Sequence, residues 1–215
     1  MKMNKVKLPE LNEELAEFMG IIAGDGYLFK KNNRGFGIVG NPKKDMPYFL
    51  KIQKMAKNLF NKDIKIFERS RGLRTVVYSN NIFDFLTKEY GLPFGKGKCC
   101  RIFIPEKIIK NTKLTNSFIR GIVDTDGSIF MSNKPRSPNY PSIEITTTSK
   151  ILAFQIKEHL VKQRFRVAKI WSCKSKNKLT VYRIPLNGKQ NVRSWLDKIG
   201  FSNPYKLEIA INSLK

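Results

Sequence analysis

Two acidic residues, Asp25 and Asp126, recur in the same local setting about half a chain apart. Residues 18–26 read FMGIIAGDG and residues 119–127 read IRGIVDTDG, so each segment is an apolar helical run that ends in Asp-Gly. Carboxylates are among the ligands that Mg²⁺ prefers in proteins. The internal repeat therefore predicts a duplicated chain in which one acid from each half meets the other at a pseudo-twofold axis.

The small residues inside each repeat predict how these acids come together. Gly20 and Gly24 lie four positions apart, and Gly121 and Thr125 repeat this spacing, which lets two helix backbones approach closely. Such packing places each carboxylate at the negative end of a helix and beside a like charge, at a cost of roughly 0.3–1 kcal/mol for each helix dipole. Divalent cations would reverse both penalties, which favours a metal site. The alternative is that Asp-Gly simply ends each helix as a turn with solvated carboxylates.

A third acid, Asp124, has Ala23 at the matching place of the first repeat. On a helix it points in a different direction from Asp126, two positions later. Because it cannot be essential to both halves, we interpret Asp124 as a helix-end or packing residue.

Hydrophobic periodicity and turn residues predict the same order in both halves: helix, hairpin, helix, hairpin, helix. In the first half we expect a helix from about residue 11 that Gly26 caps, further helices at 43–60 and 81–90, and strands at 27–31, 35–39, 63–69 and 73–79. In the second half we expect helices at 114–126, 150–164 and 190–199, and strands at 128–132, 142–148, 167–173 and 179–184. Pro105 is expected to open a short helix in the connection, and prolines at 135, 138 and 141 predict a longer loop in the second half's first hairpin.

The charge of the chain sets the class of its partner. Lys and Arg number 41 against 17 Asp and Glu, which gives a net charge of +24 and a pI of about 10.1. Such a charge needs a polyanion to offset it, and nucleic acid is the natural candidate. A ribosomal-type protein or a lysine bias of the genome is the alternative. The sequence has no run of 18 apolar residues and no apolar signal-peptide core at its N-terminus, so we expect an intracellular protein in the compartment that holds DNA, the cytoplasm of a prokaryote or an organelle.

Histidine and cysteine are too sparse for several classes of chemistry. Cys99, Cys100 and Cys173 form no CxxC pair, so we expect reduced thiols. His159 is the single histidine, which excludes zinc sites and nucleases built on histidine. Because it falls in a lysine-rich helical stretch, we expect His159 at the surface and outside catalysis.

The segments that follow the two repeats also match each other. Residues 91–98 (GLPFGKGK), with Ile104 and Pro105 beyond them, have a counterpart in residues 200–206 (GFSNPYK). Together with the two repeats, these segments resemble the LAGLIDADG homing endonucleases of the single-chain, two-motif type, over essentially the whole chain. The repeats depart from the family pattern at Phe18, Met19, Ala23, Arg120 and Thr125.

The resemblance implies an α+β fold of two αββαββα repeats, each with a four-stranded antiparallel sheet. The two sheets would form a saddle on duplex DNA around the two motif helices. The implied domains are residues 1–95 and 114–215, joined by a linker at 96–113, and the implied protein is a monomer.

The same resemblance implies a site-specific double-strand DNA endonuclease that uses two or three Mg²⁺ ions, with Mn²⁺ or Ca²⁺ as substitutes. It places the metal ligands at two carboxylates and at the two backbone carbonyls before them: Asp25, Asp126, Gly24 and Thr125. Lys98 matches the family's active-site lysine, and Lys206 is its partner in the other half. Both would neutralise charge on the phosphate or orient a water, while the metals activate the water and stabilise the leaving 3′ oxygen.

Alternating basic and aromatic residues predict one DNA-facing side on each sheet. On such a face Arg and Lys read guanine and Asn reads adenine, while many side chains contact only phosphate. The candidates are Lys31, Asn33, Arg69, Arg71 and Arg74 in the first half and Lys134, Arg136, Lys174 and Lys176 in the second. Since Arg69 and Arg71 correspond to Cys173 and Ser175, we expect an asymmetric, non-palindromic target.

Two other functions stay open at this point. An intron RNA maturase or splicing cofactor would use the same basic saddle on RNA, and a non-cleaving, sequence-specific DNA-binding protein would use it on DNA. Loss of the motif acids would favour both, whereas both acids are present. The sequence carries no flanking self-splicing blocks, so we expect an intron-encoded or free-standing protein that takes part in intron homing.

Overall fold

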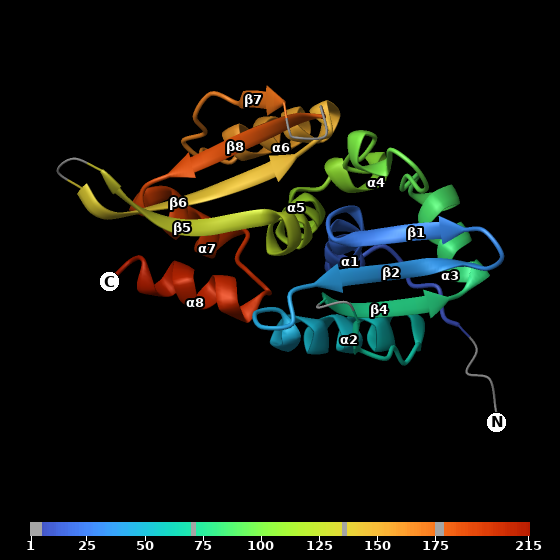
Figure 1. Cartoon of the computed structure of the whole chain (residues 1–215). Coiled ribbons are helices and arrows are strands. Elements are labelled where there is room, and N and C mark those ends of the chain that lie inside the picture. Colours follow the sequence, from blue (N-terminus) through green and yellow to red (C-terminus); the bar gives the residue numbers. More distant parts are fainter. Residues whose placement is uncertain (1–5, 70–71, 135–136, 175–178) are drawn as a thin grey trace.

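Two antiparallel four-stranded sheets flank a central pair of helices in the computed structural model, which describes residues 6–69, 72–134, 137–174 and 179–215 (Figure 1). The first half contains α1 (Glu13–Ala23), β1 (Gly26–Lys30), β2 (Arg34–Gly40), α2 (Met46–Phe60), β3 (Phe67–Arg69), β4 (Gly72–Tyr78), α3 (Asn80–Asp84) and a π-helical turn (Phe85–Glu89). A 3₁₀ turn (Lys98–Cys100) and α4 (Glu106–Ile109) form the connection. The second half contains α5 (Thr112–Asp126), β5 (Gly127–Lys134), β6 (Ser137–Thr147), α6 (Lys150–Lys162), β7 (Trp171–Lys174), β8 (Thr180–Asn187), α7 (Lys189–Lys198) and α8 (Pro204–Asn212). This is the α+β architecture that the sequence predicts.

Both sheets have the same strand order and the same register, which defines equivalent residues. The orders are β1-β2-β4-β3 and β5-β6-β8-β7. Gly26 of β1 pairs with Ile38 of β2, as Gly127 of β5 pairs with Ile145 of β6. Because each first hairpin starts directly after a motif helix, the two sheets lie on either side of the α1–α5 pair (Figure 1).

One face of each sheet packs against helices and closes the hydrophobic core. The buried residues of the first sheet are Leu28, Phe36, Ile38, Leu73 and Val77, and those of the second are Ile129, Ile143, Ile145, Ile184 and Leu186. Helices α1 and α3 contact the first sheet, and α6 and α7 contact the second. Alternation along each strand therefore directs the other set of side chains outward. None of the described helices is long and apolar enough to cross a membrane.

The motif helices α1 and α5 touch through their backbones. A Cβ atom added to Gly20 would clash with the carbonyl oxygen of Phe118 and lie 3.1 Å from the Cα of Gly121. A Cβ added to Gly121 would lie 2.8 Å from the amide nitrogen of Ile21. The close helix contact that the sequence predicts from these two glycines is thus present.

A buried ion pair also joins the two motif helices. Oε2 of Glu17 accepts hydrogen bonds from Arg120, at 2.8 Å from Nε and 2.6 Å from Nη2, and Arg120 also donates to the carbonyl of Ile199 at 2.8 Å. The matching positions in the opposite repeats hold Phe118 and Met19. Removing one partner would leave a buried charge without compensation, so this pair favours the contact between unlike halves over a contact between two like ones.

The outer strands are shorter than the sequence predicts. Strand β3 covers only Phe67–Arg69 and β7 only Trp171–Lys174, where residues 63–69 and 167–173 were expected. The carbonyl of Ile64 accepts a hydrogen bond from Nε2 of Gln53 at 2.6 Å, which ties this segment to α2 and leaves it outside the sheet.

The first hairpin of the second half is a long ribbon, and the longer loop predicted from its prolines is wrong. Pairing between β5 and β6 extends to Lys134 and Ser137. Strand β8, however, pairs only with Ser142–Thr147 of β6. Pro138 therefore lies in a two-stranded extension, and Pro141 lies at its base, where its carbonyl accepts a hydrogen bond from the amide of Gly188 at 2.8 Å. A missing backbone N–H is tolerated at the edge of a sheet.

Two smaller predictions are also wrong. Gly26 does not cap the first helix, because α1 ends at Ala23, the amide of Gly24 donates to the carbonyl of Gly20 at 3.0 Å, and Gly26 opens β1. His159 is buried in place of lying at the surface, with its Nε2 at 2.7 Å from Oδ1 of Asn116.

Helix α8 was not predicted, although it has a clear start signal. The side chain of Asn203 accepts a hydrogen bond from the amide of Tyr205 at 3.1 Å, and Pro204 occupies the first helical position. The helix contacts β5 and carries Lys206 to the end of α5.

We expect Gly20→Ala to lower the free energy of unfolding by about 3 kcal/mol, because the added methyl group meets main-chain atoms that move only if the two helices separate. Gly72→Ala is the matched control, since the nearest atom to its added Cβ is 3.7 Å away. Urea denaturation followed by circular dichroism measures both variants. Equal stabilities would contradict a backbone contact between α1 and α5.

Candidate active site

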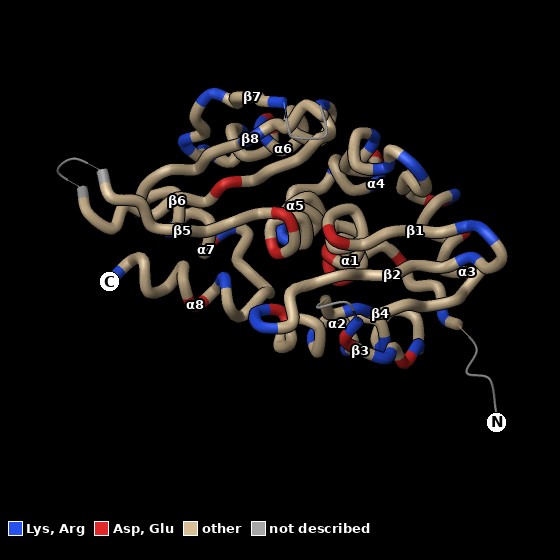
Figure 2. The backbone as a smooth tube through the Cα atoms, viewed as in Figure 1, with Lys and Arg blue, Asp and Glu red and all other residues tan. Residues whose placement is uncertain are grey.

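The contact between the motif helices places Asp25 and Asp126 in one region of the fold. Asp25 follows the end of α1, and Asp126 is the last residue of α5. A Cβ added to Gly24 would clash with the hydroxyl of Thr125 and lie 3.4 Å from Oδ2 of Asp126. Acidic residues accordingly gather where the ends of α1 and α5 meet, whereas Lys and Arg are spread over the periphery (Figure 2).

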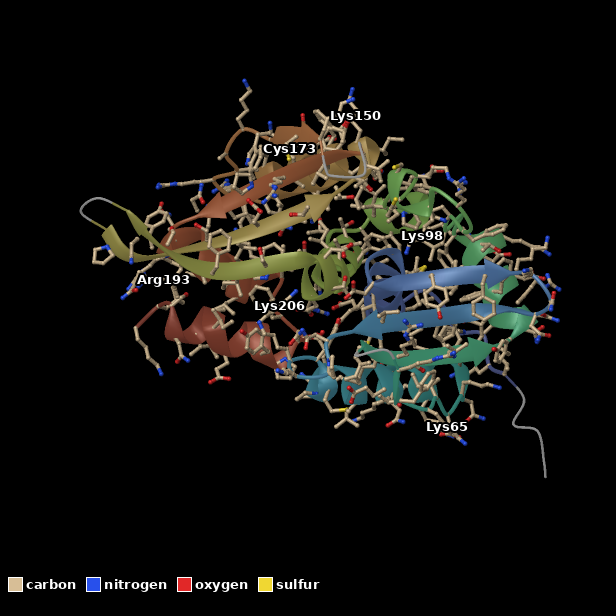
Figure 3. The ribbon with its side chains drawn as sticks, in the orientation of Figure 1. Lys65, Lys98, Lys150, Cys173, Arg193 and Lys206 are labelled. Atoms are coloured by element: carbon tan, nitrogen blue, oxygen red, sulfur yellow. The ribbon has the colours of Figure 1, made fainter. Side chains whose placement is uncertain are left out.

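Lys98 and Lys206 bind the last carbonyls of the two motif helices in the same way. Nζ of Lys98 donates hydrogen bonds to the carbonyls of Ile22 at 3.0 Å, Gly24 at 3.2 Å and Gly26. Nζ of Lys206 donates to the carbonyls of Val123 at 2.7 Å, Thr125 at 3.2 Å and Gly127 at 2.6 Å. The two lysines lie on opposite sides of the central helices (Figure 3). Each cation supplies a donor to carbonyls at and just beyond the helix end and opposes the negative end of the helix dipole.

Shifted pKa values reflect a crowded, negatively charged centre. Burial, followed by the charge of Asp126, raises the pKa of Asp25 to about 7, while Lys206 and Lys98 act to lower it. Desolvation by the surrounding protein also raises the pKa of Asp126, although this residue is exposed on its open side. Burial lowers the pKa of both lysines, against the effect of the aspartates. Such mutual perturbation within one cluster marks a candidate functional site.

Asp124 is 2% exposed and bonded to the segment before α8. Its Oδ2 accepts a hydrogen bond from the amide of Ser202 at 2.7 Å, and burial raises its pKa to about 7. Its carbonyl accepts from Nδ2 of Asn203 at 3.4 Å. These contacts give Asp124 a place in packing α8 against the motif helix.

Asp45 is an acidic neighbour of the site that sequence reasoning missed. Its charge acts to raise the pKa of Asp25, and its Oδ1 accepts a hydrogen bond from Nδ2 of Asn203 at 3.3 Å. The residue immediately precedes α2, where Pro47 marks the helix start, and this was the only signal in the sequence. Ser149 precedes the equivalent helix α6, so the two halves differ here by one charge.

Hollows open on both sides of the motif helix ends. One of about 320 Å³ is lined by Gly24, Lys98, Cys99 and Asp126 among others, and one of about 290 Å³ by Asp45, Asp124, Thr125 and Lys206 among others. Asp25 borders a third hollow of about 790 Å³ together with Lys43 and Asp45. A phosphate group and its cations could thus reach the acids from outside.

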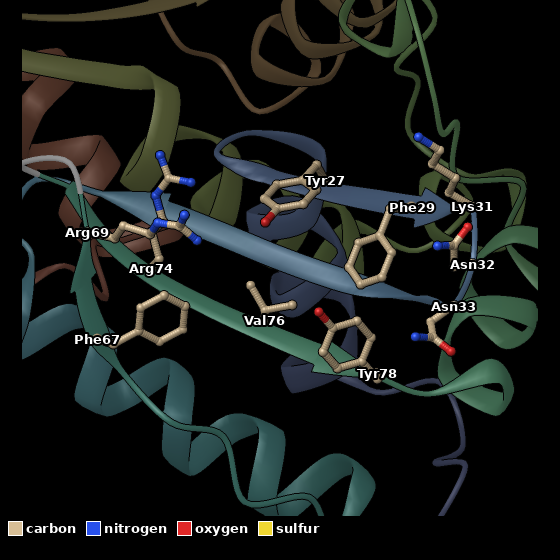
Figure 4. Close-up of a pocket in the computed structure, with 10 residues that line it drawn as sticks. All are labelled: Tyr27, Phe29, Lys31, Asn32, Asn33, Phe67, Arg69, Arg74, Val76 and Tyr78. Atoms are coloured by element: carbon tan, nitrogen blue, oxygen red, sulfur yellow. The ribbon is translucent and has the colours of Figure 1, made fainter.

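Four of the predicted DNA contacts border one hollow on the outward face of the first sheet. Lys31, Asn33, Arg69 and Arg74 line this hollow of about 440 Å³ (Figure 4). Lys174 is exposed at the end of β7. Arg71, Arg136, Lys176 and the side chain of Lys134 lie outside the described residues.

The donor atoms at the helix ends fit a hard divalent cation. Among the described residues no three His, Cys, Asp or Glu side chains form a cluster that would hold a metal by itself. Mg²⁺ commonly takes only one or two carboxylates and fills its remaining positions with water or phosphate oxygens. The carboxylates of Asp25 and Asp126 and the carbonyls of Gly24 and Thr125 form such a set, because each lysine-bound carbonyl keeps a second lone pair.

Comparisons with known proteins agree with this geometry. A family model described as a LAGLIDADG-like domain matches residues 113–200. The fold is similar to that of I-DmoI in complex with DNA and Mn, with a TM-score of 0.61 and 18% identity over 88% of this chain and 97% of that one. Residues 113–200 therefore match a LAGLIDADG-like domain, and the chain shares the fold of LAGLIDADG proteins. The N-terminal LAGLIDADG domain of DUF199/WhiA is also similar, with a TM-score of 0.56 and 17% identity over 91% of this chain and 87% of that one. The LAGLIDADG fold thus occurs in differently named proteins and does not by itself establish cleavage.

Curated relatives contain a segment similar to nearly the whole of this chain. The small subunit of replication factor C from Methanocaldococcus jannaschii is 33% identical over 213 residues, which are 96% of this chain and 10% of that protein. An A-type ATP synthase protein of Pyrococcus abyssi is 26% identical over 197 residues, which are 91% of this chain and 17% of that protein. The chain therefore spans less than a fifth of these two relatives. Because the names of these two relatives describe different activities, the similarity shows a shared segment and does not show a shared activity.

We expect Asp25→Asn to stabilise the metal-free protein at pH 8 by roughly 1–3 kcal/mol and to have little effect at pH 4. The pKa of Asp25 is about 7 in the folded state against 3.8 as its ordinary value, so the folded state holds a proton between these values that the unfolded state has lost. The destabilising contribution of Asp25 therefore grows as the pH rises from about 4 through 7.

Denaturation of both proteins in EDTA across this pH range measures the difference. Asp197→Asn, at an exposed aspartate on α7, controls for the change of net charge alone. A difference between Asp25→Asn and the parent that does not vary with pH would refute the electrostatic account of the site.

Proposed function

We propose that this protein is a site-specific, metal-dependent endonuclease that cuts both strands of duplex DNA. The observation that carries the proposal is the pairing of Asp25 and Asp126 at adjoining helix ends, each with a lysine bound beside it. Stability alone disfavours this arrangement, because like charges adjoin each other and the negative helix ends. Binding of a divalent cation and of a DNA phosphate at this centre would account for the pairing of the two acids.

Each half of the chain would supply one acid, one carbonyl and one lysine to the cleavage site. Asp25 and Asp126, with the carbonyls of Gly24 and Thr125, would hold the cations. Lys98 and Lys206, held by carbonyls at the helix ends, would supply positive charge beside the phosphate, one lysine for each half. When bound, the cations activate a water and stabilise the leaving oxygen.

The two sheets would supply the DNA contacts on either side of this centre. Their outward faces lie on opposite sides of α1 and α5 (Figure 1), and the net charge of +24 favours a polyanion. One chain contains both halves, so it would act as a monomer. Because equivalent positions on the two sheets carry different side chains, the target would be asymmetric.

The fold is also compatible with a protein that binds nucleic acid without cleaving it. An intron RNA maturase or a non-cleaving DNA-binding protein could use the same surfaces. The presence of both motif acids favours cleavage, because neither alternative requires two carboxylates at a helix junction.

The double variant Asp25→Asn, Asp126→Asn should lose double-strand cleavage by at least about a thousandfold and keep its affinity for the target within a few fold, because it removes the metal ligands and adds no bulk. Cleavage of a selected duplex target in Mg²⁺ and binding by electrophoretic mobility shift measure the two properties. Asp63→Asn, at an exposed aspartate paired with Lys57 at 2.8 Å, is the matched control. Cleavage that survives the double change would refute the mechanism, and a parent protein that binds its target without cutting would favour the alternatives.

Mg²⁺ should raise the melting temperature of the parent protein in the absence of DNA. At a concentration about ten times the dissociation constant, binding to the folded state alone contributes ~1.4 kcal/mol, which is a shift of a few degrees. The double variant should show no shift. Equal shifts of the melting temperature in the parent and the double variant would show that Mg²⁺ binds at a site other than Asp25 and Asp126.

A further inference from the structure

The outward face of the first sheet is apolar at its centre. Tyr27 and Phe29 of β1, Phe67 of β3, and Val76 and Tyr78 of β4 line the hollow shown in Figure 4. Phe67 is 40% exposed and Tyr78 is 62% exposed. We call these five side chains the aromatic face. Aromatic rings left in water together mark a binding surface.

Two glycines on the central strand let the rings cover the middle of the sheet. A Cβ added to Gly37 would clash with the ring of Tyr27, and one added to Gly35 would lie 2.9 Å from Cζ of Phe29. The rings of Phe29 and Tyr78 meet edge to face, with centroids 5.6 Å apart. The aromatic face is therefore continuous across β1, β2 and β4, and the described residues place no charged group at its centre.

Charged and amide groups lie at the two ends of the aromatic face. Val39 pairs with Arg74 and donates its N–H to the carbonyl of Asp25 at 3.2 Å, so Arg74 lies at the end nearest the motif acids. Nε of Arg74 is buried and has no partner in the described part of the chain. Lys31 and Asn33 lie at the other end, in the turn between β1 and β2.

We propose that the aromatic face reads the methyl groups of thymine in the major groove, so that the half-site beneath the first sheet is A·T-rich at its centre. This inference rests on the proposed function, since it takes the sheet to lie in the groove of duplex DNA. Thymine presents a methyl group there that no other standard base carries, and apolar side chains contact it. Guanine is expected at the end near Arg74, and adenine or phosphate contacts at the turn.

The spacing of the strands matches that of the base pairs. Side chains two residues apart on one face of a strand are about 6.7 Å apart, and two base-pair steps of DNA cover roughly the same distance. Tyr27 and Phe29 should therefore meet methyl groups about two base pairs apart. Tyr78 and Val76 lie in the same two rows, since Gly35 and Gly37 pair with them.

The second sheet provides a partial internal control, because its equivalent face keeps two exposed aromatic side chains, Phe130 and Trp171 in place of Phe29 and Phe67, and is polar or non-aromatic at four other positions. By pairing register, Tyr27, Gly37, Val76 and Tyr78 correspond to Ser128, Glu144, Pro185 and Asn187. Arg183 pairs with Glu144 at 2.7 Å across this face and stacks on Trp171 at 4.7 Å from the ring centroid. Base pairs beneath Ser128, Pro185 and Asn187 should therefore show no comparable dependence on thymine methyl groups, whereas Phe130 keeps an apolar contact like that of Phe29.

The test is a selection of bound sequences from a random duplex library with the double variant Asp25→Asn, Asp126→Asn, which would leave the DNA intact. Thymines selected under the first sheet are then replaced one at a time by deoxyuridine, which removes only the methyl group. We expect each replacement to weaken binding roughly fourfold under the first sheet, and less than twofold beneath Ser128, Pro185 and Asn187 of the second. Cleavage of the same duplexes by the parent protein is measured alongside.

The variant Tyr27→Ser introduces the side chain of the equivalent residue in the second half, Ser128. It tests whether the loss of affinity on removing a thymine methyl group depends on the aromatic face. At the position that Tyr27 contacts, the variant should bind duplexes with thymine and with deoxyuridine equally well. The affinity losses caused by Tyr27→Ser and by deoxyuridine would therefore not add. Thermal denaturation of Tyr27→Ser checks that the protein is folded. A full methyl preference in Tyr27→Ser would overturn the assignment. Val76→Thr, which keeps the side-chain shape, gives a second measurement in the same row of the sheet.

The remaining outcomes separate the two proposals. A G·C-rich first half-site, or no effect of deoxyuridine, in a target that the parent protein still cuts would overturn the thymine inference and leave the proposed function standing. Tighter binding to the single strand or its RNA counterpart than to the duplex would make the aromatic face a platform for unpaired bases and overturn the inference. A duplex that is bound with the expected methyl dependence but never cut would support the inference and refute the nuclease.

Discussion

The close approach of two helix backbones is the constraint on which the rest of the structure depends. At Gly20 and Gly121 there is no room for a side chain, so α1 and α5 meet main chain to main chain. Their ends must then adjoin, together with Asp25 and Asp126. Each motif helix also leads directly into the first strand of a sheet, so the same contact fixes where the two sheets stand. The site and the surfaces beside it are therefore consequences of one packing contact.

This packing has an electrostatic cost that the surrounding residues reduce but do not remove. Lys98 and Lys206 neutralise the helix ends through carbonyl hydrogen bonds, yet the pKa of Asp25 is still raised to about 7. An excess of negative charge thus persists at the centre of a strongly basic protein (Figure 2). In the proposed nuclease, cations and phosphate would meet that centre while the basic periphery holds the duplex.

The repeated elements could be predicted from the sequence, and the contacts between distant segments could not. The glycine spacing and the Asp-Gly ends predict the motif helices because both are local patterns that occur twice. Lys98 and Lys206 were found through resemblance, but their carbonyl partners depend on where the chain returns after the last helix of each half. Helix α8 was missed although Asn203 and Pro204 signal its start, and Asp45 was missed because only tertiary packing brings it to the site. The buried place of His159 likewise depends on α5, which lies far away in the sequence.

The central claim is that one acid from each half holds divalent cations in a single site. Anomalous scattering from Mn²⁺ in crystals of the protein with its duplex target tests this claim most directly. The account predicts strong peaks within coordination distance of the carboxylates of both Asp25 and Asp126, and their loss in the double asparagine variant. Peaks confined to other residues, or carboxylates that stay solvated beside an ordered phosphate without metal, would contradict it.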